Sequence, residues 1–504
     1  MKNILFMLLF SYNCFSQIAG SLDTSFNFTG TSTRCNYTSP SINFINNSFF
    51  QFNDKIICLN FNFTSCSITL TRFNGDGSLD NSFGTNGVIV NTMCAVFTNG
   101  GYYPYNMVIQ PDNKIVIMGL QQNTTYPNAY WVVRLLPNGD LDPSFNGNGY
   151  LDVSFGTVQD RGYCVALQPD GKILLGGNTG NTAEFFSVAR INSNGSLDTT
   201  FGVNGLAKTA FSTLESTPIS IAVQADGKIV LGGYTVTAYA RDFALARFNN
   251  NGTLDLTFGD NGKVITTVDY TNSDAISKVL IEPDGKITAV GDASFTNNPY
   301  TAMTRYLSNG SLDNTFGLSG IVLASNVTGR RPTFARQVDG KYVIGGGGDS
   351  GTFQVYRYNY DGTLDTGFGS NGSAFTTPFA DNATAVLIQP DNKIVVVGNT
   401  VSPDGLENCT TVFRFNPGTL STNEFEGIAL NLYPNPTQDN IYFDNSNTQY
   451  TTAEIYNYLG QEVGKQNIGL SNNEKLELNN FSSGVYMLKF FGEKGILFQK
   501  VIKN

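Results

Sequence analysis

The stretch at residues 246–259, ARFNNNGTLDLTFG, decides the fold because variants of it recur along the chain. Three landmarks each occur seven times, at intervals of 52 to 62 residues. The first is Leu-Asp-x-x-Phe, which begins at Leu22, Leu79, Leu141, Leu197, Leu254, Leu312 and Leu364. The second is an Asp one or two residues before a Lys and an apolar run: Asp54, Asp112, Asp170, Asp226, Asp284, Asp339 and Asp391. The third is an Arg before an apolar residue: Arg72, Arg134, Arg190, Arg247, Arg305, Arg357 and Arg414. Such a period is typical of a repeat architecture.

One copy, at residues 259–310, shows the local structure of the repeat. Pro283-Asp284-Gly285 predicts a tight turn, because Pro presets φ and Gly accepts a positive φ. Apolar runs on both sides of the turn indicate a hairpin. The copy therefore predicts four short strands, at residues 263–267, 276–281, 286–291 and 302–307.

Seven such copies predict an all-β protein, with a seven-bladed β-propeller of four-stranded units at residues 18–420. One four-stranded sheet cannot bury both of its faces, whereas sheets arranged around an axis bury them against their neighbours. An open solenoid is the alternative architecture, but a solenoid needs polar caps, and the sequence shows none.

The repeat resembles the delta-60 repeat, a family of β-propeller repeats. Residues 246–259 follow the family pattern closely, and residues 168–173, QPDGKI, match its companion motif. The resemblance covers residues 21–417 and implies a propeller. It implies no particular activity.

A constant spacing links two of the landmarks. Six arginines each precede an Asp by eight residues: Arg72 and Asp80, Arg134 and Asp142, Arg190 and Asp198, Arg247 and Asp255, Arg305 and Asp313, and Arg357 and Asp365. A guanidinium and a carboxylate on either side of one turn predict a bidentate pair that fixes the turn.

The two ends of the repeat region complement each other. Arg414 has no such Asp after it, and Asp23 has no Arg before it. We therefore expect Asp23 to pair with Arg414, or residues 21–30 to lie beside the last unit, which would close the ring.

The C-terminal region is a separate module. A polar linker is expected at residues 421–428, and residues 429–504 predict a small β-sandwich. Tyr433, Pro434, Asn435 and Pro436 open this region, and the last residues include Lys500-Val501-Ile502-Lys503. These motifs resemble the type A sorting domain of the type IX (Por) secretion system. The resemblance implies that the type IX machinery is a partner and that the protein crosses the outer membrane, often with removal of this module and attachment to surface lipopolysaccharide. A carbohydrate-binding sandwich is the alternative, but the module has no Trp to stack on a sugar.

Residues 1–17 have the layout of a removable signal peptide. Lys2 precedes an apolar stretch at residues 4–10, and a polar stretch follows. A buried first strand is the alternative. No later segment is apolar enough to be a transmembrane segment. We expect a secreted protein, or one attached to the outer-membrane surface, after removal of the signal peptide.

The composition excludes several classes of function. The chain has no His, which excludes Ser-His-Asp nucleophile systems and imidazole metal sites. The net charge is -10 and no basic block occurs, so nucleic-acid binding is not expected. Six Cys remain after the signal, none with CxxC spacing: Cys35, Cys58, Cys66, Cys94, Cys164 and Cys409. Disulfides in the first units and buried free thiols both remain open.

The acidic residues suggest two kinds of site, neither of which the sequence singles out. Asn74, Asp76, Ser78 and Asp80 suit a calcium loop, although turn chemistry explains the same residue types. Paired carboxylates can support glycoside cleavage, and Glu184 and Glu215 are candidates because they break the repeat. For Glu184 and Glu215, the alternative is that they are solvated surface residues. We therefore predict no catalytic, metal or cofactor residues.

The aromatic residues suggest a binding surface around the second unit. It would consist of Tyr102, Tyr103, Tyr105, Tyr126, Tyr130 and Trp131, which do not repeat. A core location is the alternative. Two functions follow from these observations. The favoured one is a non-catalytic secreted protein that binds an unknown protein or glycan, and the alternative is an extracellular carbohydrate-active hydrolase or lyase.

Overall fold

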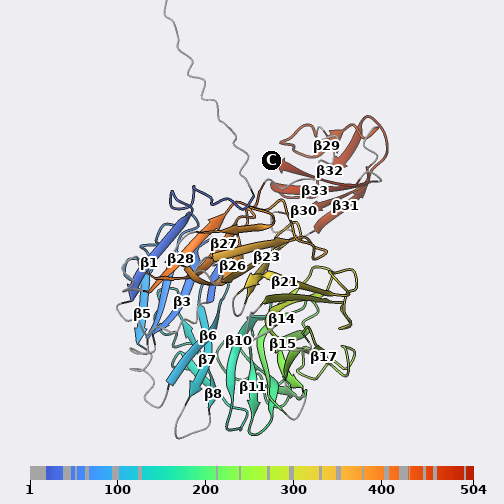
Figure 1. Ribbon diagram of the computed structural model, residues 1–504. Coiled ribbons are helices and arrows are strands. Elements are labelled where there is room, and N and C mark those ends of the chain that lie inside the picture. Colours follow the sequence, from blue (N-terminus) through green and yellow to red (C-terminus); the bar gives the residue numbers. More distant parts are fainter. Residues whose placement is uncertain are drawn as a thin grey trace, which may run out of the picture. The chain divides into compact units, whose positions relative to one another are not determined.

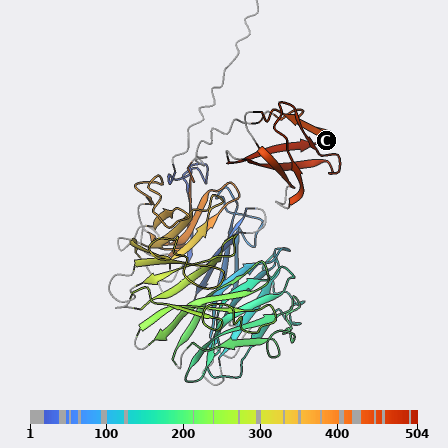
Figure 2. The same cartoon turned by 90° about the vertical axis from the view of Figure 1, so that its right-hand side faces the viewer.

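The computed structural model divides the chain into two compact units, Met1–Gly418 and Thr419–Asn504, which are treated separately below. It describes residues 19–37, 47–50, 54–62, 67–92, 101–122, 128–211, 214–237, 240–269, 273–293, 300–328, 332–347, 353–376, 380–401, 408–418, 430, 432–446, 450–457, 462–492 and 495–504. The predicted signal peptide and linker lie outside the described residues. Figures 1 and 2 show both units as strands joined by turns and loops.

The described residues of the first unit form seven antiparallel sheets of four strands each. The first two sheets hold β2 (Asn47–Phe50), β3 (Ile56–Asn62), β4 (Ser67–Phe73) and β5 (Val88–Thr92), and β6 (Gly101–Ile109), β7 (Ile115–Gln122), β8 (Ala129–Leu135) and β9 (Tyr150–Val153). The next two hold β10 (Arg161–Leu167), β11 (Ile173–Gly180), β12 (Glu184–Ile191) and β13 (Leu206–Thr209), and β14 (Ser216–Val223), β15 (Ile229–Thr237), β16 (Ala240–Phe248) and β17 (Lys263–Thr266). The fifth and sixth hold β18 (Ala275–Ile281), β19 (Ile287–Ala293), β20 (Tyr300–Tyr306) and β21 (Ile321–Thr328), and β22 (Thr333–Arg336), β23 (Tyr342–Gly347), β24 (Phe353–Tyr358) and β25 (Ser373–Phe375). The last combines β26 (Ala380–Ile388), β27 (Ile394–Val401) and β28 (Asn408–Phe415) with β1 (Thr31–Tyr37).

The sheets follow one another around the unit in the manner of propeller blades. The first strand of each sheet contacts the first strand of the next, and β26 contacts β2. The all-β fold class with repeated four-stranded sheets was therefore predicted correctly. The grouping of the strands within a copy was wrong in one respect: β17 pairs with β16 and so belongs to the preceding sheet, because the strand after each Leu-Asp-x-x-Phe motif folds back onto the strand before it.

Each sheet has two ends with different connections. The hairpin between the first and second strands and the long turn between the third and fourth strands lie at one end, here called the turn end. The connection between the second and third strands, and the passage to the next sheet, lie at the other, here called the loop end. The turn end contains all three repeated landmarks, and the loop end contains segments that vary from sheet to sheet.

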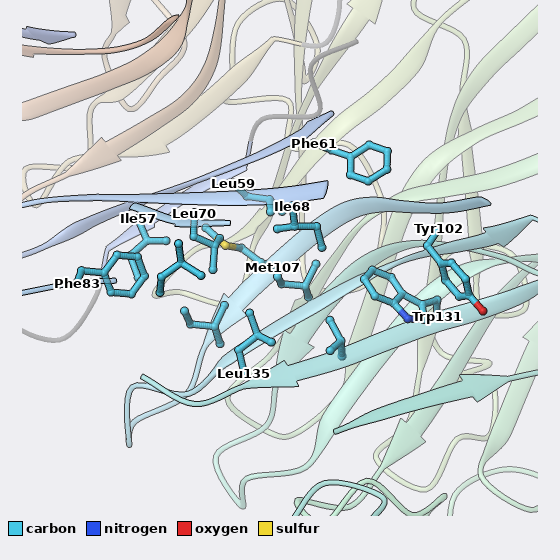
Figure 3. Packing of buried hydrophobic residues seen from close by; sticks show 14 residues of the cluster. Ile57, Leu59, Phe61, Ile68, Leu70, Phe83, Tyr102, Met107, Trp131 and Leu135 are labelled. Carbon is cyan, nitrogen blue, oxygen red and sulfur yellow. The ribbon is translucent and has the colours of Figure 1, made fainter. Parts of the chain in front are cut away.

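The core of the unit lies between neighbouring sheets. Figure 3 shows the cluster between the β2–β5 and β6–β9 sheets, where Leu59, Met107 and Leu135 are fully buried. The second strand of each sheet is buried on both faces. At some of its positions there is no room for a side chain larger than that of Gly. A Cβ atom on Gly177 in β11 would lie only 2.1 Å from the carbonyl oxygen of Arg161.

The two ends of the first unit rebuild one turn of the repeat. Within the β10–β13 sheet, Gly195 N–H donates to Asn192 O (2.9 Å) and Asn192 N–H donates to Ser196 O (2.8 Å). In the last sheet, Gly20 N–H donates to Asn416 O (2.8 Å) and Asn416 N–H donates to Ser21 O (2.8 Å). Residues near the two ends of the unit thus replace the continuous turn, and β1 completes the sheet beside β28 (Figure 1).

One cysteine of this last sheet takes part in a disulfide. Cys409 in β28 is disulfide-bonded, and its register partner in β1 is Cys35. Cys58 and Cys164 are buried cysteines that take part in no disulfide. Cys409 lies in the last sheet, so the disulfides are not confined to the first units.

The second unit contains a four-stranded and a two-stranded sheet. The first has the order β31 (Glu462–Asn467), β30 (Tyr450–Tyr456), β33 (Gly484–Gly492) and β34 (Gly495–Lys503), and the second pairs β29 (Asn440–Phe443) with β32 (Glu474–Glu477). Ile441 and Leu476 from the small sheet pack with Ile455 and Leu488 from the large one in one core. The described part of the chain contains no helix that is long and apolar enough to cross a membrane.

Candidate functional site

The repeated Arg and Asp residues meet at the turn end. Asp142 Oδ2 lies 2.8 Å from Arg134 Nε, and Asp142 Oδ1 accepts hydrogen bonds from the amide and hydroxyl of Ser144. The Arg Nε to Asp Oδ2 distances are 2.6 Å for Arg72 and Asp80, 2.8 Å for Arg134 and Asp142, 2.8 Å for Arg190 and Asp198, 2.7 Å for Arg247 and Asp255, 2.9 Å for Arg305 and Asp313, and 2.7 Å for Arg357 and Asp365. The structure thus brings together every pair with the eight-residue spacing.

The contacts differ from the bidentate geometry that the spacing suggested. Arg134 uses Nε for the carboxylate, Nη2 for the Ser144 hydroxyl (3.1 Å) and Nη1 for the carbonyl of Ser193 in the next sheet. Its guanidinium also lies over the ring of Phe145, 4.7 Å from the centroid. One guanidinium therefore fixes its own turn and also holds the neighbouring sheet, so a single carboxylate does not receive two parallel bonds.

The same contact closes the ring. Arg414 Nε lies 2.8 Å from Asp23 Oδ2, and Arg414 Nη1 donates to Gly75 O (2.6 Å) in the first sheet. Lys393 also contacts Asp23 Oδ2 at 2.9 Å. Burial raises the pKa of Asp23, but the hydrogen bonds from Ser25 and Lys393 and the charge of Arg414 outweigh that effect, so the pKa is lowered.

The proposed calcium loop has the contacts of a turn. Asp76 Oδ1 accepts hydrogen bonds from the amide (2.9 Å) and hydroxyl (2.6 Å) of Ser78. Asp80 Oδ2 contacts Lys55 and Arg72, both at 2.6 Å. Among the described residues, no group of three or more Cys, Asp or Glu side chains is arranged to hold a metal ion.

The structure places three of the six residues of the aromatic surface expected around the second unit in the core. Tyr102, Tyr130 and Trp131 are 4%, 0% and 0% exposed, and Figure 3 shows Tyr102 beside Trp131 within the core cluster. These rings fill the space between sheets, because their strand positions face neighbouring sheets. Tyr103 is half-buried with its ring 6.2 Å from Phe61, and Tyr126 lies outside the described residues.

The loop end of the third and fourth sheets contains a group of charged and aromatic side chains outside the three repeated landmarks. We call this group the loop-end belt. It consists of Arg161, Tyr163, Glu184, Glu215, Tyr234 and Arg241. β10 begins at Arg161, β12 begins at Glu184, and Glu215 directly precedes β14. These strands all begin at the loop end, so the residues at their starts lie at one end of two adjacent sheets.

Glu184 is held by residues from both sheets. Its Oε1 lies 3.6 Å from Arg161 Nη1, and its Oε2 accepts hydrogen bonds from Asn178 Nδ2 (2.5 Å) and the Thr217 hydroxyl (3.5 Å). The Glu184 side chain remains 16% exposed and that of Arg161 34% exposed. The carboxylate is therefore positioned but still reachable from solvent.

Glu215 is held by the fourth sheet. It accepts a hydrogen bond from the Tyr234 hydroxyl, and both of its oxygens lie 3.4 Å from Arg241 Nη2. The Arg241 guanidinium lies over the Tyr234 ring, 4.2 Å from its centroid. The side chains of Glu215 and Arg241 are 39% and 30% exposed.

The two carboxylates influence each other electrostatically. Burial, together with the charge of Glu215, raises the pKa of Glu184, although Arg161, Asn178 and Thr217 act in the opposite direction. Burial also raises the pKa of Tyr163 to about 12. The Tyr163 ring packs against Tyr105 at 5.2 Å, so a half-buried aromatic pair borders the charged groups.

The belt combines side chains that sequence reasoning treated separately or missed. Glu184 and Glu215 were candidates, and the structure brings them within electrostatic range of each other. Arg161, Tyr163, Tyr234 and Arg241 were missed. The available signal was the change of residue type at equivalent loop-end positions of successive sheets, which becomes visible only after the strands are aligned.

Two family models match the chain. A domain of unknown function described as the DUF5122 β-propeller matches residues 110–145, 168–201, 224–258, 282–316, 337–368 and 389–418. A secretion system C-terminal sorting domain matches residues 431–504. The chain carries DUF5122 β-propeller repeats and a C-terminal sorting domain. The resemblance to delta-60 repeats is consistent with this result. The family model matches six repeats, so the count of seven blades stays a prediction.

The sorting domain establishes how the DUF5122 repeats are exported. Such a domain marks a protein for type IX secretion, so the chain is a secreted β-propeller protein. Its opening motif lies at the edge of the second unit, where Tyr433 N–H donates to Tyr442 O (3.0 Å) and Asn435 Oδ1 accepts from Ile502 N–H (3.0 Å).

Comparison with solved structures finds similar β folds at low identity. Drosophila Semaphorin 1b, extracellular domains 1–2, is 10% identical with a TM-score of 0.41, covering 79% of this chain and 87% of that chain. The polysaccharide lyase Uly1 is 11% identical with a TM-score of 0.40, covering 80% of this chain and 98% of that chain. No ligand or reaction is transferred from likenesses at this level. A comparison with curated proteins finds no match.

Proposed function

We propose that this secreted propeller is a non-catalytic binding protein that holds an extracellular ligand at its loop end. The observation that carries the proposal is the loop-end belt. It places partly exposed charged and aromatic side chains at one end of two adjacent sheets, where the repeat itself does not require them. Residues that depart from a repeat without serving its packing are candidates for recognition.

The contacts of the two carboxylates support a binding role. Glu184 contacts Arg161 and Asn178, and Glu215 contacts Arg241 and Tyr234. A carboxylate held in place by such contacts is well positioned to accept a hydrogen bond from a ligand hydroxyl. The same contacts preorganise the belt, which lowers the entropic cost of binding.

An extracellular carbohydrate-active enzyme is the second candidate. One observation favours it: the pKa of Glu184 is raised, and Glu215, a second carboxylate, contributes to that shift. Two carboxyl groups with different pKa values are what acid and base roles in glycoside cleavage require.

A capture experiment tests the proposal. The tagged chain without its signal peptide is incubated with the extracellular fraction of the producing cells, and the bound material is analysed for protein and sugar. We expect a stoichiometric ligand that the double variant Glu184→Gln/Glu215→Gln does not retain. Val203→Ser, an exposed turn-end residue in the same sheets, is the matched control and should retain it. If new reducing ends appear in the captured material, the enzyme reading replaces the binding reading.

A further inference from the structure

We propose that the loop-end belt is a subsite for a neutral, hydroxyl-rich carbohydrate, an inference that rests on the proposed function. The charge of the belt is the first argument. Arg161 pairs with Glu184 and Arg241 pairs with Glu215, so two acids balance two bases. An anionic or cationic ligand would have to break one of these pairs, and the freed partner would then lose its counter-charge.

The hydrogen-bonding capacity of the belt is the second argument. Carboxylates only accept hydrogen bonds and guanidinium groups only donate them, and the belt alternates the two types across two sheets. A sugar ring presents adjacent hydroxyl groups, each of which can both donate and accept. Such a ligand can bridge Glu184 and Arg161, or Glu215 and Arg241, without disturbing the charge balance.

A buried amide beneath the belt extends this capacity. Asn178 is fully buried and donates to Glu184 Oε2 and to the Thr217 hydroxyl. Its Oδ1 has no hydrogen-bond partner among the described residues. A buried acceptor without a donor is costly, and a hydroxyl-bearing ligand, directly or through one water, would supply a donor.

The aromatic border is the third argument. Tyr105 and Tyr163 come from adjacent sheets and form a tilted pair with ring centroids 5.2 Å apart, and both side chains are half-buried. Sites for small ligands combine aromatic surface with a few precisely placed polar groups. The apolar face of a sugar ring suits such a border, while its hydroxyl groups face the charged pairs.

A protein partner is the main competing ligand, and it would use different residues. The core of a protein interface is depleted in charged residues and is anchored by apolar or aromatic side chains. Among the described residues near the belt, Val158 and Leu214 are exposed apolar side chains, 60% and 43% exposed. The two ligand classes therefore predict loss of binding from different substitutions.

The test uses the full chain without its signal peptide and the extracellular fraction as the probe. The fraction is divided into untreated, protease-treated and periodate-treated samples, since periodate cleaves adjacent hydroxyl groups. We expect binding to survive protease and to be lost after periodate, and the captured polymer to pass through an anion exchanger unretained. Loss of binding after protease, or a captured polymer that the exchanger retains, overturns the inference and leaves the binding function standing. Capture of nothing by any sample overturns both.

Matched variants assign the ligand to the belt. Glu215→Gln and Arg241→Ala should each weaken binding at least tenfold, because each removes one charged hydrogen-bond partner. The double variant Val158→Ser/Leu214→Ser should bind within twofold of the original chain. The reverse pattern would assign the surface to an apolar partner and reject the carbohydrate subsite. Thermal unfolding of each variant identifies any change that results from misfolding.

Discussion

The two ends of the propeller use the same side-chain types for different purposes. At the turn end, Arg305 and Asp313 have side chains that are only 2% and 4% exposed, and the same contact recurs from sheet to sheet. At the loop end, Arg241 and Glu215 are 30% and 39% exposed and have no repeated counterpart. A repeated buried pair maintains the ring, whereas a single accessible pair is available for recognition.

A third acidic residue shows that breaking the repeat is not sufficient evidence of function. Glu282 lies at the turn end, where the corresponding residue is Gln168 or Gln389 in other sheets. It is 1% exposed, accepts hydrogen bonds from Thr288 (2.6 Å) and Tyr342 (2.8 Å), and contacts Arg336 at 2.8 Å. Glu282 thus has its partners inside the protein and is closed to solvent, whereas Glu184 and Glu215 remain reachable.

The largest expected effect follows from removing one partner of a buried turn-end pair. Arg305→Ala leaves Asp313 buried without its main counter-charge and removes the contact to the next sheet at Tyr360 O. Breaking a buried ion pair in this way costs about 3–5 kcal/mol. Urea unfolding measures the change. Arg241→Ala is the matched control at the loop end and should cost less than about 1 kcal/mol, because its pair is partly exposed. Equal losses would remove the distinction between the two ends.

The next effect concerns the covalent closure of the ring. We predict that peptide mapping without reductant recovers Cys409 linked to Cys35, its register partner in β1. Cys409→Ser, or reduction of the bridge, should lower the free energy of unfolding by about 2–4 kcal/mol, since the bridge restricts the unfolded chain. The buried free thiol Cys164 serves as the control, because reductant should leave it unchanged. A linkage of Cys409 to any other cysteine would contradict the predicted pairing.

The turn end also predicts the response of stability to acid. The pKa values of Asp198 and Asp255 are lowered to about 2, because hydrogen bonds from Thr200 and Thr257 and the neighbouring arginines outweigh the effect of burial. The unfolded chain binds these protons near pH 3.8, so the folded chain binds them only at lower pH. The stabilisation is therefore complete above about pH 4 to 5 and is lost as the pH falls toward 2. Unfolding curves between pH 7 and pH 2 should show this loss, and Asp198→Asn should reduce it. A stability that stays constant down to pH 2 would refute the assignment.

The sequence predicted the turn end well because each of its contacts is local and repeated. Arg247 and Asp255 are eight residues apart, as are five other Arg and Asp pairs, and even the pairing of Asp23 with Arg414 follows from completing the pattern. The loop end was not predictable in this way. Arg161 and Glu184 come together across one sheet, and Glu215 approaches Glu184 only because the next sheet is adjacent.

The burial of Tyr130 and Trp131, which were expected at a surface, has a similar physical cause. Tyr130 lies four residues before Arg134, and the equivalent positions are Phe186 and Phe243, both buried. The aligned repeat therefore contained the information that Tyr130 belongs to the core. Trp131 has no aromatic counterpart, and its burial beside Tyr102 depends on the packing of this particular pair of sheets.

The smallest expected effect on stability is at Glu184, where the effect on binding should be large. The pKa of this carboxyl is raised above its usual 4.5, so the folded chain retains the proton at a higher pH than the unfolded chain does. The ionised form is therefore slightly unfavourable for folding, and stability contributed by this group increases as the pH falls through its pKa. Glu184→Gln should accordingly leave the free energy of unfolding at pH 7 unchanged within about 1 kcal/mol.

Ligand binding should weaken as the pH falls, whereas the stability contributed by Glu184 increases. Protonation of Glu184 removes a carboxylate acceptor, so we expect binding of the captured ligand to weaken as the pH is lowered from 7 toward 4.5. Glu184→Gln should bind weakly at every pH and lose this dependence, whereas Val203→Ser should retain it. Titration of binding against pH measures both properties. If the pH dependence of binding persists in Glu184→Gln, another group titrates, and Glu184 is not the residue that recognises the ligand.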